Sequence, residues 1–280
     1  MTFPDFDPVL LQIGPFALRW YALAYIAGIG LGWWWGRRLA DARFWGVAGP
    51  PITKEQVDDF VLWIALGIIL GGRIGYVLFY SPGTIVREPL EVLQIWQGGM
   101  SFHGGFLGVV IATVVFSLRN KVDMLRLGDM VAPCVPFGLF FGRMANFVNA
   151  ELWGRPTDAP WGMVFCNERL LQSYGGTCPA GPLPRHPSQL YEAALEGVAL
   201  FLILYWATHI AKLLPRRGTT TGLFLVFYAV FRTAVETVRE PDARVFFDVL
   251  TTGQALSLPM LLVGLWLILR AKPYGAPQTA

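Results

Sequence analysis

The sequence predicts an all-α integral membrane protein of about seven transmembrane helices, with a small cap between the fourth and the fifth. Hydrophobic residues make up 54% of the 280-residue chain, and the mean hydropathy is +0.48. Charged residues make up 15%, whereas a soluble domain has about 25%. Helices are the expected elements because a helix satisfies its own backbone hydrogen bonds in lipid.

Seven apolar runs approach the length of about 20 residues that a helix needs to cross a bilayer. They lie near residues 17–36, 57–80, 99–118, 128–147, 188–211, 221–238 and 254–270. The acidic N-terminus, Met1 to Pro8, lacks the basic start of a cleavable signal peptide. We therefore expect the first run to remain a membrane helix, in one membrane-embedded domain that spans residues 1–280.

The basic residues between the runs predict an orientation. Twelve Lys and Arg residues lie in the connections after runs one and three, after run five and beyond run seven, against six on the opposite side. Cytoplasmic loops carry the excess of Lys and Arg. The alternation predicts an odd number of spans, an outside N-terminus and a cytoplasmic C-terminus.

The longest outside connection, residues 148–187, is expected to fold as the cap. Its six prolines and the Gly175-Gly176 pair make it rich in turns. It contains Cys166 and Cys178, which either pair in an oxidising compartment or remain free thiols. The three cysteines of the chain lack metal-ligand spacing, so we expect no metal site.

Residues 142–155 are the most unusual stretch, because they place several polar groups at the end of the fourth apolar run. Arg143 appears while the pattern is still apolar, and Asn146, Asn149, Glu151 and Arg155 follow. Ionisable groups at membrane depth are costly and usually mark a functional site.

Four ionisable groups from four runs share one depth under the predicted orientation. Runs two, four and six lead outward, which places Arg73, Arg143 and Arg232 toward their outer ends. Run three leads inward, with His103 near its start. Because the planar guanidinium binds phosphate bidentately, the three arginines indicate a phospholipid headgroup.

The alternative is a structural ion network in which the arginines pair with Glu151, Glu236 and Glu240. We favour the headgroup because these carboxylates are too few to neutralise every cation. His103 has two interpretations as well. It is either a general base, since histidine takes up a proton near neutral pH, or a structural residue in a glycine-rich segment.

Other polar and glycine-rich patterns also have two interpretations. The glycines around Arg73 suit close helix packing. Tyr21 and Tyr25 repeat at i, i+4 and suit an interfacial belt as well as a site. Run six carries one polar stripe, formed by Tyr228, Arg232, Glu236 and Arg239.

These segments resemble the bacterial prolipoprotein diacylglyceryl transferase family over nearly the whole chain. The matching segments are residues 71–76, 101–105, 142–155, 185–192, and Phe231-Arg232 with Glu236 and residues 239–242. Ala150 stands where the family often has glycine, and Met144 and Ala145 also vary the usual pattern. None of the three removes a charged or hydrogen-bonding group.

The resemblance implies transfer of the sn-1,2-diacylglyceryl group from phosphatidylglycerol to the lipobox cysteine of a prolipoprotein signal peptide. It implies a bacterial inner-membrane enzyme with a periplasmic N-terminus and cap, and no cofactor, metal or nucleic acid. By motif, His103, Arg143 and Arg232 are the expected catalytic residues. The expected phosphatidylglycerol-binding residues are Arg143, Arg232, Tyr21, Arg73, Asn146, Glu151, Gly154, Tyr228, Glu236 and Arg239.

The competing interpretation is a transporter or flippase for an anionic lipid, which would also hold arginines at membrane depth. Such a protein is expected to open to both leaflets and often contains a halved repeat. Here the deep cations gather toward one side and no repeat is evident. A purely structural membrane protein would leave the clustered polar residues unexplained.

Overall fold

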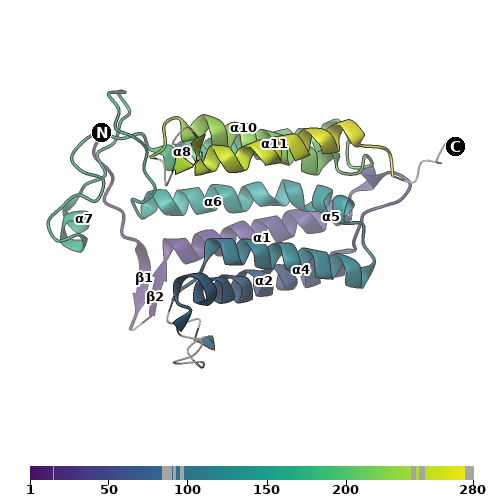
Figure 1. The fold of residues 1–280 in the computed structure, drawn as a ribbon, viewed down its shortest axis with the longest axis horizontal. Helices are drawn as coiled ribbons and strands as arrows, with labels where there is room; N and C mark the ends of the chain where they lie inside the picture. Colours follow the sequence, from purple (N-terminus) through teal and green to yellow (C-terminus); the bar gives the residue numbers. More distant parts are fainter. Residues whose placement is uncertain are drawn as a thin grey trace.

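Long helices lie side by side along the longest axis of this computed structural model, which describes residues 1–14, 16–83, 90, 93–94, 98–240, 244–245 and 250–274. The chain begins at one end of the bundle, and its last helix finishes at the other (Figure 1). The principal helices are α1 (Trp20–Ala40), α2 (Lys54–Tyr80), α4 (Phe102–Asn120), α5 (Met124–Val131), α6 (Val135–Val148), α8 (Ser188–Glu192), α9 (Leu200–Tyr205), α10 (Thr219–Glu236) and α11 (Thr252–Arg270). Shorter elements are η1 (Arg43–Trp45), η4 (Ala132–Cys134), α7 (Glu168–Ser173) and the π-helical segments η5 (Ala193–Ala199) and η6 (Trp206–Ile210).

Five helical stretches of the described chain are long and apolar enough to cross a membrane. They are Lys54–Tyr80, His103–Asn120, Met124–Val148, Ser188–Ile210 and Thr252–Arg270. Predicted runs one and six correspond to α1 and α10, which pack against α6 and α11. The helical, multi-pass character predicted from hydropathy is confirmed, and each run is helical to within a few residues of its predicted bounds.

Two short antiparallel ladders accompany the helices. β1 (Val9–Ile13) pairs with β2 (Phe16–Arg19), with Val9 opposite Arg19. Residues 17–19, expected at the start of the first helix, therefore belong to a strand, and α1 begins at Trp20. Gly14 has a φ of +57° at the turn, a conformation that glycine adopts without steric cost. β3 (Arg244–Val245) pairs with β4 (Leu250–Thr251).

Facing glycines join α2 to α4. A Cβ added to Gly75 would lie 2.6 Å from Gly104 Cα, and one added to Gly71 would lie 2.8 Å from Gly108 Cα. Small residues let two membrane helices approach until their backbones touch. The packing role predicted for these glycines is confirmed, and it fixes the start of α4 against α2.

Residues 148–187, which include α7, lie at the end of the bundle where the chain begins (Figure 1). Phe3 packs with Phe147, Met163 and Phe165 in a small hydrophobic core, and Phe3 N donates to Val164 O at 2.9 Å. The structure joins Cys166 to Cys178 in a disulfide, one of the two alternatives that the sequence left open. The N-terminus is thereby packed onto the predicted cap.

Gly71→Ala is expected to lower the midpoint of thermal unfolding in detergent, because its methyl group would lie between two backbones in contact. Overpacking of this kind costs about 1–3 kcal/mol. Gly105→Ala is the matched control, since its Cβ would lie 3.6 Å from Ile68 O, an ordinary contact. Its midpoint should stay or rise, because alanine favours a helix more than glycine does. Equal midpoints for the two variants would contradict this account of the α2–α4 contact.

Candidate functional site

A buried carboxylate, Glu192 at the end of α8, lies at the centre of the site. Arg143 Nε on α6 lies 3.1 Å from Glu192 Oε2, and Arg232 Nη1 on α10 lies 2.6 Å from Oε1. Arg239 Nη1, just beyond α10, lies 3.4 Å from the same Oε1. The Glu192 side chain is 0% exposed. Three guanidinium groups thus meet one carboxylate that water does not reach.

Two more carboxylates complete this arginine cluster. Glu196, one helical turn after Glu192, lies 3.5 Å from Arg143 Nη2, and Glu236 lies 3.0 Å from Arg232 Nη2. Three cations therefore face three carboxylates, as buried charges require. The Arg143 side chain keeps 18% of its surface exposed, so part of its guanidinium fork can still meet an anion.

The carboxylates that neutralise the arginines differ from those expected from sequence. Of Glu151, Glu236 and Glu240, only Glu236 joins the cluster, and the judgement that carboxylates were too few was wrong because it omitted Glu192 and Glu196. The sequence does contain a feature that points to Glu192 and Glu196. They are the only acidic residues between positions 190 and 210, and the argument applied to deep arginines applies equally to them.

The segment after α6 folds back over α8 through its own polar groups. Asn146 Nδ2 donates to Glu151 Oε1 at 2.8 Å, and Gln189 Nε2 donates to Glu151 O at 2.6 Å. Ala150 has a φ of 53°, a left-handed conformation that glycine adopts more readily. This conformation accounts physically for a glycine at that position in the family that the sequence resembles.

Gly154 is a crossing point of three chain segments. Gly154 N donates to His186 O at 2.9 Å, and Arg155 N donates to Val238 O at 2.8 Å. A Cβ on Gly154 would lie 2.6 Å from Val238 O, so a larger residue would push the segments apart. Because Val238 precedes Arg239, this crossing positions an arginine of the cluster.

Arg73 and His103 lie on the neighbouring pair of helices, α2 and α4. Arg73 is buried, and its Nη1 donates to Gly98 O at 2.6 Å and to Gly99 O at 3.2 Å. It thus holds the backbone that leads into α4. His103 is exposed in the first turn of α4, after Ser101, whose Oγ accepts from Gly104 N.

The predicted tyrosines lie near the polar segments. Tyr228, one turn before Arg232 on α10, interacts electrostatically with Glu196 and Arg143. The rings of Tyr21 and Tyr25 are 5.2 Å apart, and Tyr25 interacts electrostatically with Glu151. The structure thus gathers the stripe of run six with Arg143.

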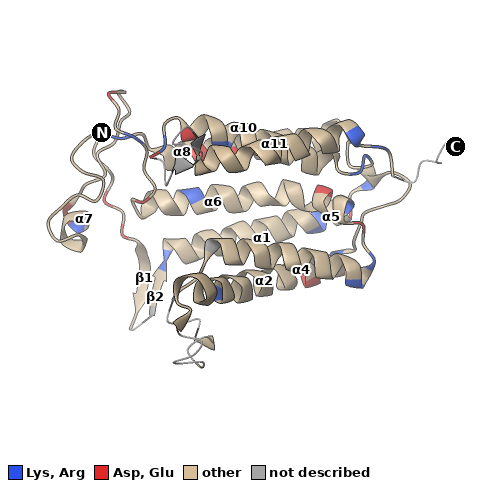
Figure 2. Cartoon of the chain, viewed as in Figure 1, with Lys and Arg blue, Asp and Glu red and all other residues tan. Residues whose placement is uncertain are grey.

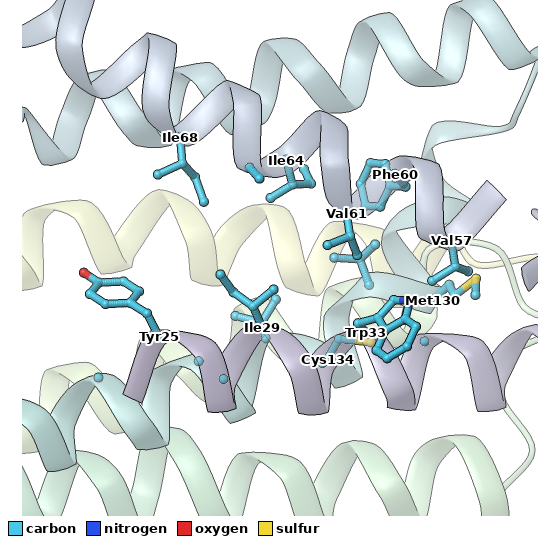
Figure 3. Close-up of a pocket in the computed structure, with 18 of the residues that line it drawn as sticks. Tyr25, Ile29, Trp33, Val57, Phe60, Val61, Ile64, Ile68, Met130 and Cys134 are labelled. Atoms are coloured by element: carbon cyan, nitrogen blue, oxygen red, sulfur yellow. The ribbon is translucent and has the colours of Figure 1, made fainter. Parts of the chain in front are cut away.

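An apolar groove of about 410 Å³ opens between α1 and α2, with α5 and α6 as its floor (Figure 3). Tyr25 and Ile29 on α1 face Ile64 and Ile68 on α2 across it. Trp33, which also lines the groove, donates from Nε1 to Asp58 Oδ1 at 2.6 Å. The lining includes Gly138 and Gly142, so this α1–α2 groove leads to the residue before Arg143.

The arrangement combines guanidinium groups that can bind phosphate with the apolar α1–α2 groove. Partly exposed guanidinium forks bind phosphate oxygens bidentately, and the groove suits hydrocarbon. Among the described residues, no group of three His, Cys, Asp or Glu side chains is placed to hold a metal ion.

Comparisons with known proteins all indicate one family. A family model described as prolipoprotein diacylglyceryl transferase matches residues 8–270. The chain is 64% identical over 280 residues to a phosphatidylglycerol–prolipoprotein diacylglyceryl transferase of Phenylobacterium zucineum, covering 99% of this chain and 96% of the relative. Proteins of the same name from Caulobacter sp. (57%, covering 97% and 95%) and Rhizobium meliloti (50%, covering 99% and 96%) are also similar.

Glu192→Gln is expected to destabilise the fold by about 3–5 kcal/mol, because it leaves buried guanidinium groups without their shared anion. Glu240→Gln is the matched control. Its carboxylate pairs with Arg185 but is 52% exposed, so its loss should cost about 1 kcal/mol or less. Chemical denaturation in detergent would measure both, and a small, equal effect would argue against Glu192 as the centre of the network.

Proposed function

The chain belongs to the prolipoprotein diacylglyceryl transferase family, and from that premise we propose its reaction and its site. It transfers the sn-1,2-diacylglyceryl group of phosphatidylglycerol to the lipobox cysteine thiol of a prolipoprotein. The products are a thioether and glycerol phosphate, in the first step of bacterial lipoprotein maturation. Family membership does not favour the transporter or flippase alternative.

The observation that carries the site assignment is the pairing of Arg143 and Arg232 around a buried carboxylate. In this reaction glycerol phosphate leaves from the sn-3 carbon, and it leaves poorly until fixed cationic groups stabilise the charge on its phosphate. Guanidinium groups already fixed by Glu192, Glu196 and Glu236 can donate their remaining N–H groups to the phosphate oxygens without reorganising. We assign Arg143 and Arg232 to the phosphate of phosphatidylglycerol.

The α1–α2 groove supports the lipid as substrate. Its volume of about 410 Å³ lies within the range of about 300–1,000 Å³ typical of ligand sites. Its exposed apolar side chains, Tyr25 and Ile29 among them, suit a substrate that enters sideways from the bilayer. A hydrocarbon chain in the groove would bring its headgroup toward Arg143.

The remaining residues take supporting roles in this proposal. His103 accepts the proton of the substrate thiol, directly or through water, because the thiolate is the nucleophile. The nucleophile belongs to the substrate, so none of the chain's own cysteines acts. The supporting set that shapes the lipid site is Tyr21, Arg73, Asn146, Glu151, Gly154, Tyr228, Glu236 and Arg239.

We further propose seven spans, with α1 and α10 added to the five stretches that meet the length and composition of a span. The N-terminus and the cap at residues 148–187 then face the periplasm of a bacterial inner membrane, and the C-terminus faces the cytoplasm. Figure 2 shows Lys and Arg concentrated where α11 finishes, which suits the cytoplasmic side. The Cys166–Cys178 disulfide suits an oxidising periplasm.

Arg143→Ala is expected to lower the turnover number by about 10²–10³-fold or more, the loss found when one stabilising charge donor is removed. Purified protein in liposomes would receive phosphatidylglycerol and a lipobox peptide, with the peptide mass followed. A gain the size of a diacylglyceryl group should appear with wild type, and not with a Cys→Ser peptide. Arg169→Ala is the control, because Arg169 lies in the 148–187 segment and pairs with Asp5 and Asp7 of the N-terminal segment. This variant should retain full turnover. Near-normal transfer by folded Arg143→Ala protein would sink the site assignment.

His103→Gln is expected to lower turnover at neutral pH by about 10²–10⁴-fold, the usual contribution of a general base. Its thermal midpoint should match that of wild type because the side chain is exposed. Full activity across the pH range would demote His103 to a structural residue.

A further inference from the structure

A second cleft, of about 340 Å³, lies between the 148–187 segment and the α8 and α10 helices. Three rings form its wall, and four aliphatic side chains lie beneath them. The wall and floor are Trp161, His186, Tyr191, Leu195, Ala234, Val235 and Val238. Nothing in the lipid site uses this Trp161 cleft.

Hydrogen bonds fix the three rings to one another. Trp161 Nε1 donates to the Tyr191 hydroxyl at 2.7 Å, and that hydroxyl lies 3.2 Å from His186 Nδ1, to which it can donate. The indole N–H, the hydroxyl and the imidazole nitrogen thus hydrogen-bond to one another. The apolar faces of the three rings remain available for contact with a ligand. Trp161 is nevertheless 53% exposed. A fixed, half-exposed tryptophan is a typical anchor for a binding partner.

The cleft adjoins the arginine cluster. Tyr191 directly precedes Glu192, and Leu195 directly precedes Glu196. Neighbouring residues on a helix are rotated by about 100°, so the cleft and the carboxylates lie on adjacent faces of the same helix. The backbone of His186 also bonds to Gly154, at the crossing that positions Arg239. In Figure 1, α6 lies between α1, which lines the α1–α2 groove, and the pair α8 and α10. The cluster therefore lies between the groove and the cleft.

The chemistry of the transfer requires the lipid and the thiol to reach the reacting carbon from different sides. The sulfur–carbon bond forms at the sn-3 carbon as the carbon–oxygen bond breaks, the electron pair leaves on the phosphate oxygen, and the thiol proton passes to the base. Displacement at a saturated carbon places the attacking sulfur opposite the leaving oxygen. A lipid that enters through the groove is thus met by a thiol from another side.

We propose that the Trp161 cleft binds an apolar side chain next to the cysteine of the substrate peptide, with the peptide extended along the seam between cap and helices. The inference rests on the proposed function and adds the peptide subsite to it. An apolar side chain fits because the floor is aliphatic and no charged residue lines the cleft. A charged side chain would be buried without a partner.

Trp161→Ala tests the cleft by separating the two substrates kinetically. The KM for the lipobox peptide should rise on the order of tenfold, while kcat and the KM for phosphatidylglycerol stay as in wild type. Trp266→Ala on α11 is the matched control, because Trp266 is 52% exposed but does not line the cleft. It should leave the peptide KM unchanged.

A second variant keeps Trp161 in place, and a binding measurement replaces it with another aromatic group. Ala234→Phe fills the cleft while the three rings remain, and it should raise the peptide KM in the same way. A photoreactive benzophenone residue at position 161 should cross-link to a Cys→Ser lipobox peptide. The cross-link should be lost when the apolar residues flanking the cysteine position are replaced by Asp.

Each contrary result has a separate meaning. Unchanged peptide KM in both variants, with active wild type, overturns the cleft and leaves the proposed function intact. A rise in the KM for phosphatidylglycerol alone also overturns it, and assigns the cleft to an acyl chain. If wild-type protein transfers nothing, the proposed function fails, and the cross-link alone then decides whether the cleft binds peptide.

Discussion

The structure of the site depends on one carboxylate that water does not reach. Charges taken out of water are costly unless each has a partner in good geometry. Glu192 lies against Arg143, Arg232 and Arg239, so the positions of α6, α8 and the end of α10 are fixed by one side chain. The turn at Glu151 and the crossing at Gly154 serve the same end, because each fixes a segment that carries a cluster residue.

Sequence alone predicted the helices and the segments that carry the proposed site. A run of apolar residues determines that a helix is buried in lipid, and a deep arginine is visible because it interrupts that run. Which side chain meets that arginine depends on the rotation and tilt of each helix, which packing sets and hydropathy does not. For this reason Arg143 was expected at the site, whereas its contacts with Glu192 and Glu196 required coordinates.

Other features escaped prediction for local reasons. The β1–β2 hairpin involves only a few residues on each strand, beside a strongly apolar run whose signal hides where the helix begins. The left-handed conformation of Ala150 is invisible because alanine rarely adopts it, and surrounding contacts impose it. In contrast, close helix packing at Gly71 and Gly75 was among the interpretations of the sequence, since close backbone approach needs residues without side chains.

The proposed entry of the lipid through the α1–α2 groove has a consequence for how saturation is measured. A molecule that enters between two helices arrives by diffusion within the plane of the bilayer, so its effective concentration is a number per unit area. Occupancy then follows the mole fraction of that lipid in one leaflet. Inert lipid added at constant total substrate would dilute it, and the same protein would show different apparent constants in small micelles and in large vesicles.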